Sequence, residues 1–203
     1  MSQLGFVFLG ARPALDFVNT LRCRKDPLTE QEDLLETLGL HSWLDAARST
    51  TTWAEALPEW KDENADSASE DGAAQAQARQ LRMAIYDLVK PHRSPANKTV
   101  AVNILNSFAG QLPTYALRTG VTGDNSDGDG LMVPSLTAQQ LLGFLAADAI
   151  QLVGTANLAK VKECAHERCG ILFEDRSNGM KRQWCSMKDC GNRAKVARFS
   201  SKN

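Results

Sequence analysis

The sequence of 203 residues lacks the features that mark several common protein classes. It has no run of about 18 apolar residues, so no segment is expected to span a membrane. Its start has neither a basic segment nor a clean apolar segment, so we expect no signal peptide and a cytoplasmic location. The G-x-S-x-G, P-loop and G-x-G-x-x-G motifs are absent, and only three histidines occur, far apart. We therefore expect no enzymatic activity.

Cysteine is scarce and unevenly placed. The chain has five cysteines, of which only Cys23 lies in its first three quarters. The other four fall in the last quarter, at Cys164, Cys169, Cys185 and Cys190. Cysteines gathered in this way in a cytoplasmic protein indicate a metal site rather than a disulfide framework.

Charge is uneven in the same way, although the net charge of −1 conceals it. Residues 160–203 contain eleven Lys and Arg against five Asp and Glu, a net charge of +6, whereas residues 1–159 have a net charge of −7. A composition with 43% hydrophobic and 23% charged residues is typical of a globular protein. We infer an acidic body followed by a basic module.

Apolar periodicity predicts a body that is mainly helical. Helices are expected around residues 12–21, 29–39, 41–49, 72–90, 95–110 and 137–153. Thr29 with Glu32, and Thr137 with Gln140, have the spacing of a helix capping box. In the helix that starts at Pro95, Val100 is expected to face inward together with Phe108.

A small amount of β-structure is expected beside these helices. The stretches PTYALRT and LMVPSL flank a Gly- and Asp-rich loop, which predicts a β-hairpin. The loop lacks the carboxylate that a calcium loop needs at its twelfth position, so no metal is assigned there. We predict an α+β fold that is mainly helical, with the boundary of a second module near residue 157.

The spacing Cys164-x4-Cys169 and Cys185-x4-Cys190 predicts a structural zinc site. Ser186 and Asp189 have N-cap and N3 spacing, which would bring the two sulfurs of the second pair together at the start of a helix. LAKVKEC and GILFEDR read as two strands of a hairpin that holds the first pair. A hairpin followed by a helix is the order of a treble-clef-like zinc module.

Three alternatives to this site remain. The cysteines could form disulfides if the protein were secreted, or they could act as a redox switch. His166 could replace one cysteine as a ligand, although four sulfurs already complete a tetrahedron. We favour zinc bound by all four cysteines.

The segment RQWCSMKDCGNRAKVAR, with CAHERCGILFEDRS before it, resembles the CGNR zinc-finger family. The stretch ALDFVNTL near the N-terminus is similar to the ABATE domain that precedes this finger in two-domain bacterial proteins. The resemblance implies an ABATE-like regulatory domain over residues 1–157 and a CGNR finger over residues 158–203. It also implies a transcription regulator whose finger binds DNA.

The basic C-terminal segment favours contact with nucleic acid. A helix from about Met187 to Ser200 would align Lys195, Arg198 and Lys202 on one face, with Val196 and Phe199 packed against the strands. Arg193 is expected near the metal, paired with Asp175 or with a backbone carbonyl. The candidate DNA contacts are Lys181, Arg182, Arg193, Lys195, Arg198 and Lys202.

A polar cluster in the first helix is the second candidate site. Arg12, Asp16, Asn19 and Thr20 lie beside an apolar stripe, and Arg12 could pair with Asp16 one turn away. They could line a pocket for a small-molecule effector, or they could tie the helix to a neighbouring loop by buried hydrogen bonds, which we favour. The body could also form a homodimer.

The preferred function is a DNA-binding transcription regulator that contains zinc. The alternative is a protein–protein adaptor in which the finger is a structural clasp.

Overall fold

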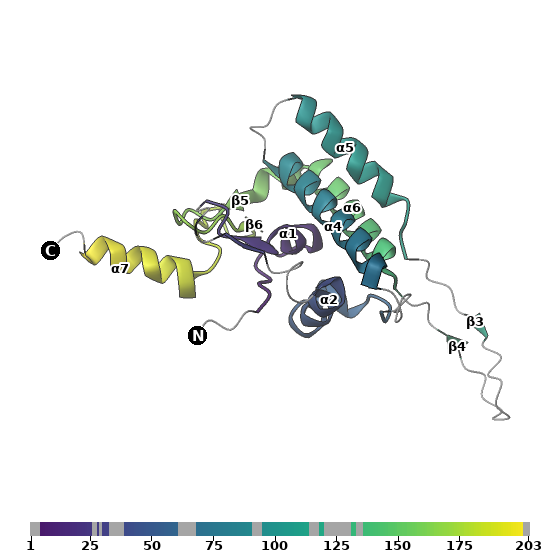
Figure 1. The fold of residues 1–203 in the computed structure, drawn as a ribbon. Coiled ribbons are helices and arrows are strands. Elements are labelled where there is room, and N and C mark those ends of the chain that lie inside the picture. The colour runs from purple at the N-terminus through teal and green to yellow at the C-terminus, as the bar shows by residue number, and fades with distance from the viewer. Residues whose placement is uncertain are drawn as a thin grey trace.

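The computed structural model describes residues 5–25, 28, 30–32, 39–60, 68–90, 95–113, 118–119, 131–132 and 136–200. Three long helices lie side by side and form the main layer of the body (Figure 1): α4 (Ala68–Val89), α5 (Pro95–Ala109) and α6 (Ala138–Val153). The helices α1 (Pro13–Val18) and α2 (Gly39–Thr50) lie beneath this layer in Figure 1, and α3 (Thr52–Glu55) packs against α2. The chain is therefore mainly helical, as the apolar periodicity predicted.

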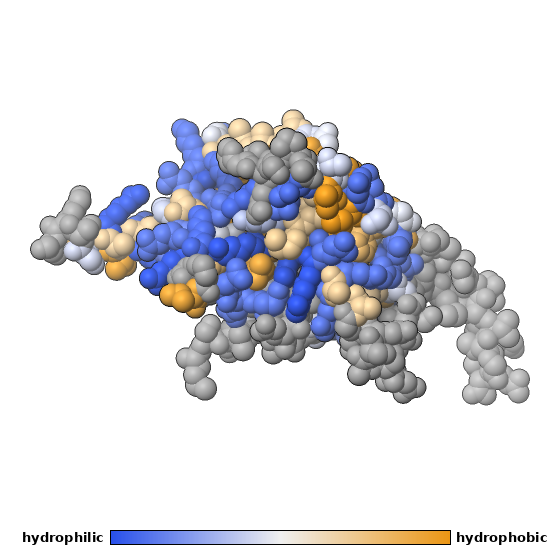
Figure 2. Space-filling view, turned by 45° about the horizontal axis from the view of Figure 1, so that its top comes forward, coloured by the Kyte–Doolittle hydropathy of each residue, from blue (hydrophilic) through white to orange (hydrophobic). Residues whose placement is uncertain are grey.

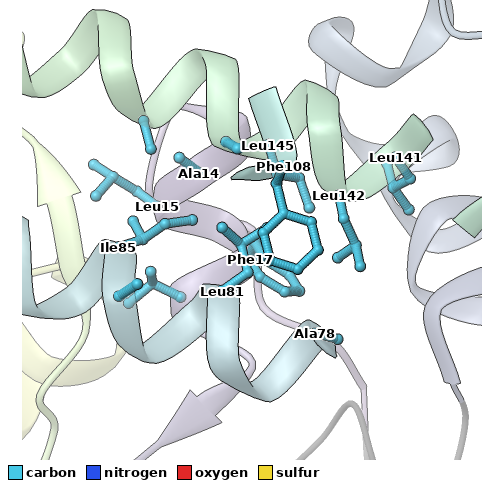
Figure 3. Close-up of a cluster of buried hydrophobic side chains, with 14 of the residues drawn as sticks. Ala14, Leu15, Phe17, Ala78, Leu81, Ile85, Phe108, Leu141, Leu142 and Leu145 are labelled. Carbon is cyan, nitrogen blue, oxygen red and sulfur yellow. The ribbon is translucent and has the colours of Figure 1, made fainter. Parts of the chain in front are cut away.

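The helices meet in one apolar core (Figure 3). Phe17 of α1 and Leu81 of α4 are fully buried, as are Leu142 and Leu145 of α6. Phe108 of α5 closes the cluster. Because burial of each such side chain contributes about 1.5–3 kcal/mol, this core is the main source of the body's stability.

Strands occur in the described residues only as short antiparallel pairs. Strand β1 (Leu21–Arg22) pairs with β2 (Gln31–Glu32), and β3 (Arg118–Thr119) pairs with β4 (Leu131–Met132). The second pair confirms the predicted hairpin, whose loop lies outside the described residues. The third pair, β5 (Val161–Glu163) with β6 (Leu172–Glu174), belongs to the C-terminal module.

The C-terminal module follows a short 3-10 helix, η2 (Ala156–Lys160). After the β5–β6 hairpin comes a π-helical turn, η3 (Met187–Gly191), which leads into helix α7 (Asn192–Ser200). Figure 1 shows α7 extending away from the helical layer. Within the described part of the chain, no helix combines the length and the apolar character that a bilayer crossing requires.

Two local predictions about the helices have opposite outcomes. The capping box of Thr137 and Gln140 is confirmed, because the Thr137 side chain accepts from the Gln140 amide and the Gln140 side chain accepts in return. The helix predicted to start at Thr29 is wrong in its first turn, where Glu32 belongs to β2. Glu32 pairs there with the buried Arg82 of α4, and this ion pair replaces the cap.

The inward orientation predicted for Val100 is also wrong. Its side chain is 59% exposed on α5, whereas Ala101, Leu105 and Phe108 face the core. Because residues 101, 105 and 108 follow the i, i+4, i+7 pattern, they define the buried stripe, and Val100 lies outside it.

Candidate metal centre

The β5–β6 hairpin positions the first cysteine pair. The Cys164 amide donates to the Ile171 carbonyl at 2.8 Å, and the Cys169 amide donates to the His166 carbonyl at 3.1 Å. Gly170 follows with a φ of +71°, a conformation that favours glycine. A Cβ there would also come within 3.2 Å of the Arg24 backbone. Glycine therefore lets the turn close and pack against the body.

The η3 turn positions the second pair. Ser186 is the N-cap, and its side chain accepts from the Asp189 amide at 3.2 Å. The Gly191 amide donates to the Ser186 carbonyl at 2.9 Å, a bond across five residues that makes the turn wider than an α-helical one. The sulfurs of Cys185 and Cys190 then lie 3.7 Å apart. The predicted cap is confirmed, and it brings the two sulfurs together as expected.

All four sulfurs lie within 4.8 Å of one another. The Cys169–Cys185 distance is 3.6 Å. A disulfide requires about 2.05 Å, so these distances exclude that bond. Four thiolates at about 2.3 Å from a zinc ion stand about 3.8 Å apart in a regular tetrahedron. The donor set and its spacing therefore fit zinc.

The crowding of the thiols also points to a cation. Hydrogen bonds with Cys169 and Cys185 hold the pKa of the Cys164 thiol well below its usual range. The contact with Cys164 raises the pKa of Cys185. Four thiolates held this close together repel one another, and a divalent ion is what allows all four sulfurs to be ionised at once.

Arg193 is placed to offset part of the net charge of −2 that zinc and four thiolates would carry. Arg193 approaches the Cys190 sulfur at 3.8 Å, so it lies at the metal site and not against Asp175. A cavity of about 550 Å³ opens beside the sulfurs, and Arg22 and Arg168 line it together with Arg193. Of these three, Arg193 directly contacts a sulfur and contributes positive charge beside the thiolates, as groups around metal ligands commonly do.

Asp175 organises the loop that follows the hairpin. Its carboxylate accepts from Lys162 Nζ at 2.7 Å, from the Ser177 hydroxyl at 2.6 Å and from the Arg182 amide at 3.0 Å. Burial opposes ionisation of this group, yet the bonds with Lys162, Ser177 and Arg182 hold the pKa of Asp175 well below its usual range. The loop before Trp184 is therefore fixed by a charged, fully bonded side chain.

Arg182, one of the candidate DNA contacts, forms its hydrogen bonds within the finger. Its Nε donates to the Trp184 carbonyl at 2.9 Å, and its guanidinium also reaches the Cys185 carbonyl. The guanidinium carbon lies 4.4 Å from the centre of the Phe173 ring. Trp184 itself is half-buried against the cysteine cluster, in the finger's small core.

The other candidate DNA contacts are distributed over the surface of the finger. Lys195 and Arg198 are exposed on α7, Arg193 is exposed at its start, and Lys181 is exposed in the preceding loop. Lys202 lies outside the described residues. The expectation that Val196 and Phe199 pack on the strands is wrong, because they are 64% and 73% exposed. Helix α7 extends away from the hairpin, so its apolar residues do not reach the strands.

The residues of the polar cluster in α1 all bond within the protein. Arg12 pairs with Asp148 of α6 at 2.6 Å and not with Asp16. Asp16 accepts from the Gly10 amide at 2.7 Å and from the Trp53 indole at 3.1 Å. Burial raises the pKa of Asp16 to about 6, although these two bonds oppose the shift.

The remaining two members connect α1 to other elements. Asn19 donates to the Leu172 carbonyl at 2.8 Å and accepts from the Leu172 amide at 2.9 Å. Thr20 donates to the Phe17 carbonyl at 2.7 Å and accepts from Arg82 at 3.0 Å. The cluster therefore connects α1 to strand β6 of the finger and to α4. None of its four residues lines the cavity beside the sulfurs.

Further bonds hold the finger on the body. The Glu174 amide donates to the Gly10 carbonyl at 3.0 Å, and Lys25 Nζ donates to the Cys164 carbonyl at 2.6 Å. Lys90, which directly follows α4, pairs with Glu163 of β5 at 3.0 Å. Sequence reasoning missed Lys25 and Lys90, because a lysine carries no pattern that names a partner more than 70 residues away.

Two family models match the chain. The model of the ABATE family, whose description reads "Putative stress-induced transcription regulator", matches residues 11–156. The model of the CGNR zinc finger matches residues 160–203. The comparison with curated proteins found no match.

Proposed function

Because the chain belongs to the ABATE family of transcription regulators and ends in a CGNR zinc finger, we propose that it regulates transcription by binding DNA through that finger. Zinc is the cofactor of the finger, and the four clustered cysteines are its proposed ligands. In this proposal the zinc module (residues 158–203) is treble-clef-like and contacts DNA in the cytoplasm. Residues 1–157 form the regulatory part.

One observation carries the proposal. Helix α7 has no buried residue, and its sequence NRAKVARFS contains three basic residues and no acidic one. The metal cluster fixes the start of this helix through Cys190 in the adjoining turn. A basic helix held on a rigid support is suited to phosphate contacts, which dominate the affinity of proteins for DNA.

The attachment of the body to the finger supports a regulatory role for the body. Asn19, Lys25 and Lys90 bond directly to the finger's hairpin. A change in α1 or α4, caused by an effector or by dimerisation, would therefore reach the hairpin without a flexible linker between them.

A salt titration tests the proposal. Binding of the zinc-loaded protein to a mixed-sequence duplex should weaken steeply between about 50 and 200 mM salt. Replacing Lys195 and Arg198 together by glutamine should reduce the slope of log K against log salt by about 2, since each phosphate contact contributes about 0.9. Arg182 is unsuitable for this test because it bonds within the finger.

The double variant Arg79→Gln, Lys98→Gln is a matched control. Both residues are exposed on helices of the body, which Figure 1 shows well separated from α7. The control should leave the slope unchanged. Binding that is absent, or equally sensitive to both double variants, would contradict the proposal.

The adaptor remains the second candidate, and the same experiment distinguishes it. It is favoured by the many bonds between the finger and the body, which make the finger part of a single structural unit. A zinc-loaded, folded protein that does not bind duplex at low salt would support this structural role.

A further inference from the structure

Two apolar residues on α7 are exposed in the part of the chain that the structure describes. Val196 is 64% exposed and Phe199 is 73% exposed, more than any apolar side chain in the described core elements α1, α4 and α6. Residues three apart on a helix lie on the same face. Val196 and Phe199 therefore form one apolar face, flanked by the exposed Lys195 and by Asn192 one turn earlier.

The charge of α7 limits what can cover this face. Arg193, Lys195 and Arg198 give the helix three positive charges without an acidic residue. A second copy of the helix would meet like charges, so charge complementarity favours an acidic partner. It must also offer apolar groups between its negative charges.

The major groove of DNA offers both. It is about 12 Å wide and admits one α-helix, and thymine presents a methyl group there between two rows of phosphates. A helix of nine residues is about 13.5 Å long. Figure 1 shows α7 projecting from the body, and Figure 2 shows both hydrophilic and hydrophobic surface on the projecting end.

We propose that α7 enters the major groove, where Val196 and Phe199 contact thymine methyl groups while Lys195 and Arg198 contact the flanking phosphates. The apolar face then supplies a preference for thymine, and the cations supply affinity that is independent of sequence. This inference rests on the proposed function, since it assigns the way in which the finger reads DNA.

The experiment compares two duplexes that differ only in methyl groups. One is rich in A·T pairs, and the other has the same sequence with uracil in place of thymine. The zinc-loaded full-length protein should bind the thymine duplex about threefold to tenfold more tightly, because a buried methyl group contributes roughly that factor.

Single variants separate the two roles. Phe199→Ala should weaken binding to the thymine duplex, leave the salt slope unchanged and reduce the preference for thymine toward onefold. Lys195→Gln should reduce the salt slope by about 1 and retain the preference. Because both side chains are exposed, neither change is expected to affect folding.

Val102→Ala is the matched control, since Val102 is an exposed valine on α5 with 42% exposure. It should leave both affinity and preference unchanged. Equal affinity for the two duplexes, together with a silent Phe199→Ala, would overturn the inference while leaving DNA binding intact. Absence of binding to either duplex would overturn this inference and the proposed function together.

Discussion

Asp16 shows how a single buried carboxyl can make stability depend on pH. Its side chain is 1% exposed, and burial raises its pKa from 3.8 to about 6. The folded state therefore holds the proton more tightly than the unfolded state. Stability from this group is fully present below about pH 4 and is lost as pH rises through about 6.

The variant Asp16→Asn should remove this dependence. Between pH 5 and 7.5 the free energy of unfolding of the wild type should fall relative to the variant by about 1.4 kcal/mol, since one pKa unit corresponds to about that energy. Urea unfolding at both pH values, followed by tryptophan fluorescence, measures the difference, because Trp53 contacts Asp16. Titration of the finger is common to both proteins and cancels. Parallel profiles would show that Asp16 ionises normally.

The residues that bind the proposed metal are predictable because their signal is local. Cys185 and Cys190 are five residues apart, and Ser186 between them caps the turn that joins them. The approach of the two sulfurs can therefore be predicted from this short segment alone. The partners of Asn19 and Arg12 carry no such signal, because Leu172 and Asp148 lie more than 130 residues away. A polar residue on a helix shows that a partner is needed without showing which residue supplies it.

At the scale of elements, α1 and β6 depend on each other through Asn19. Its amide group satisfies both the N–H and the C=O of Leu172, and all of these groups are buried. Asn19→Ala would leave two backbone groups unpaired, at a cost of about 1–3 kcal/mol each. We expect the free energy of unfolding to fall by about 2–5 kcal/mol and the Leu172 amide to exchange its hydrogen faster.

Asn103→Ala is the comparison for this variant. Asn103 is exposed on α5, so its loss should change the free energy of unfolding by less than about 0.5 kcal/mol. Urea unfolding and amide hydrogen exchange on both variants provide the measurement. An unchanged exchange rate at Leu172 in Asn19→Ala would mean that the two elements are held together by other contacts.

Elements whose apolar residues face one core were predictable from the sequence. An element whose conformation depends on an ion pair with a distant residue was not. Helix α6 follows its stripe and its capping box, so both its start and its buried face agree with the sequence. The segment at Glu32 has the spacing of a cap, but the ion pair with the buried Arg82 is formed instead. In α7 the periodicity located Val196 and Phe199 on one side, but it could not show that the hairpin lies out of their reach.

At the scale of the whole molecule, the chain has two cores of unequal size. The large core joins the body's helices and includes Leu172 of the finger. The small core consists of three buried cysteines with Ile171 and Phe173, and with half-buried neighbours such as Trp184. A core of this size cannot hold a module of some forty residues, whereas structural zinc contributes on the order of 10–16 kcal/mol in finger peptides.

Removal of zinc should therefore unfold the finger and spare the body. After treatment with a chelator, amides of the η3 turn and of α7 should exchange within minutes, while those of α4 and α6 stay protected. Cys190→Ser should give the same pattern without a chelator, and Cys23→Ser should not, because Cys23 is outside the four-sulfur cluster. Loss of protection throughout the chain would show that the body needs the folded finger. The bonds of Asn19 and Lys90 to the hairpin would then be essential for the stability of the body. Protection of the η3 turn that persists once metal analysis shows the metal to be gone would contradict a structural role for a metal at the four sulfurs.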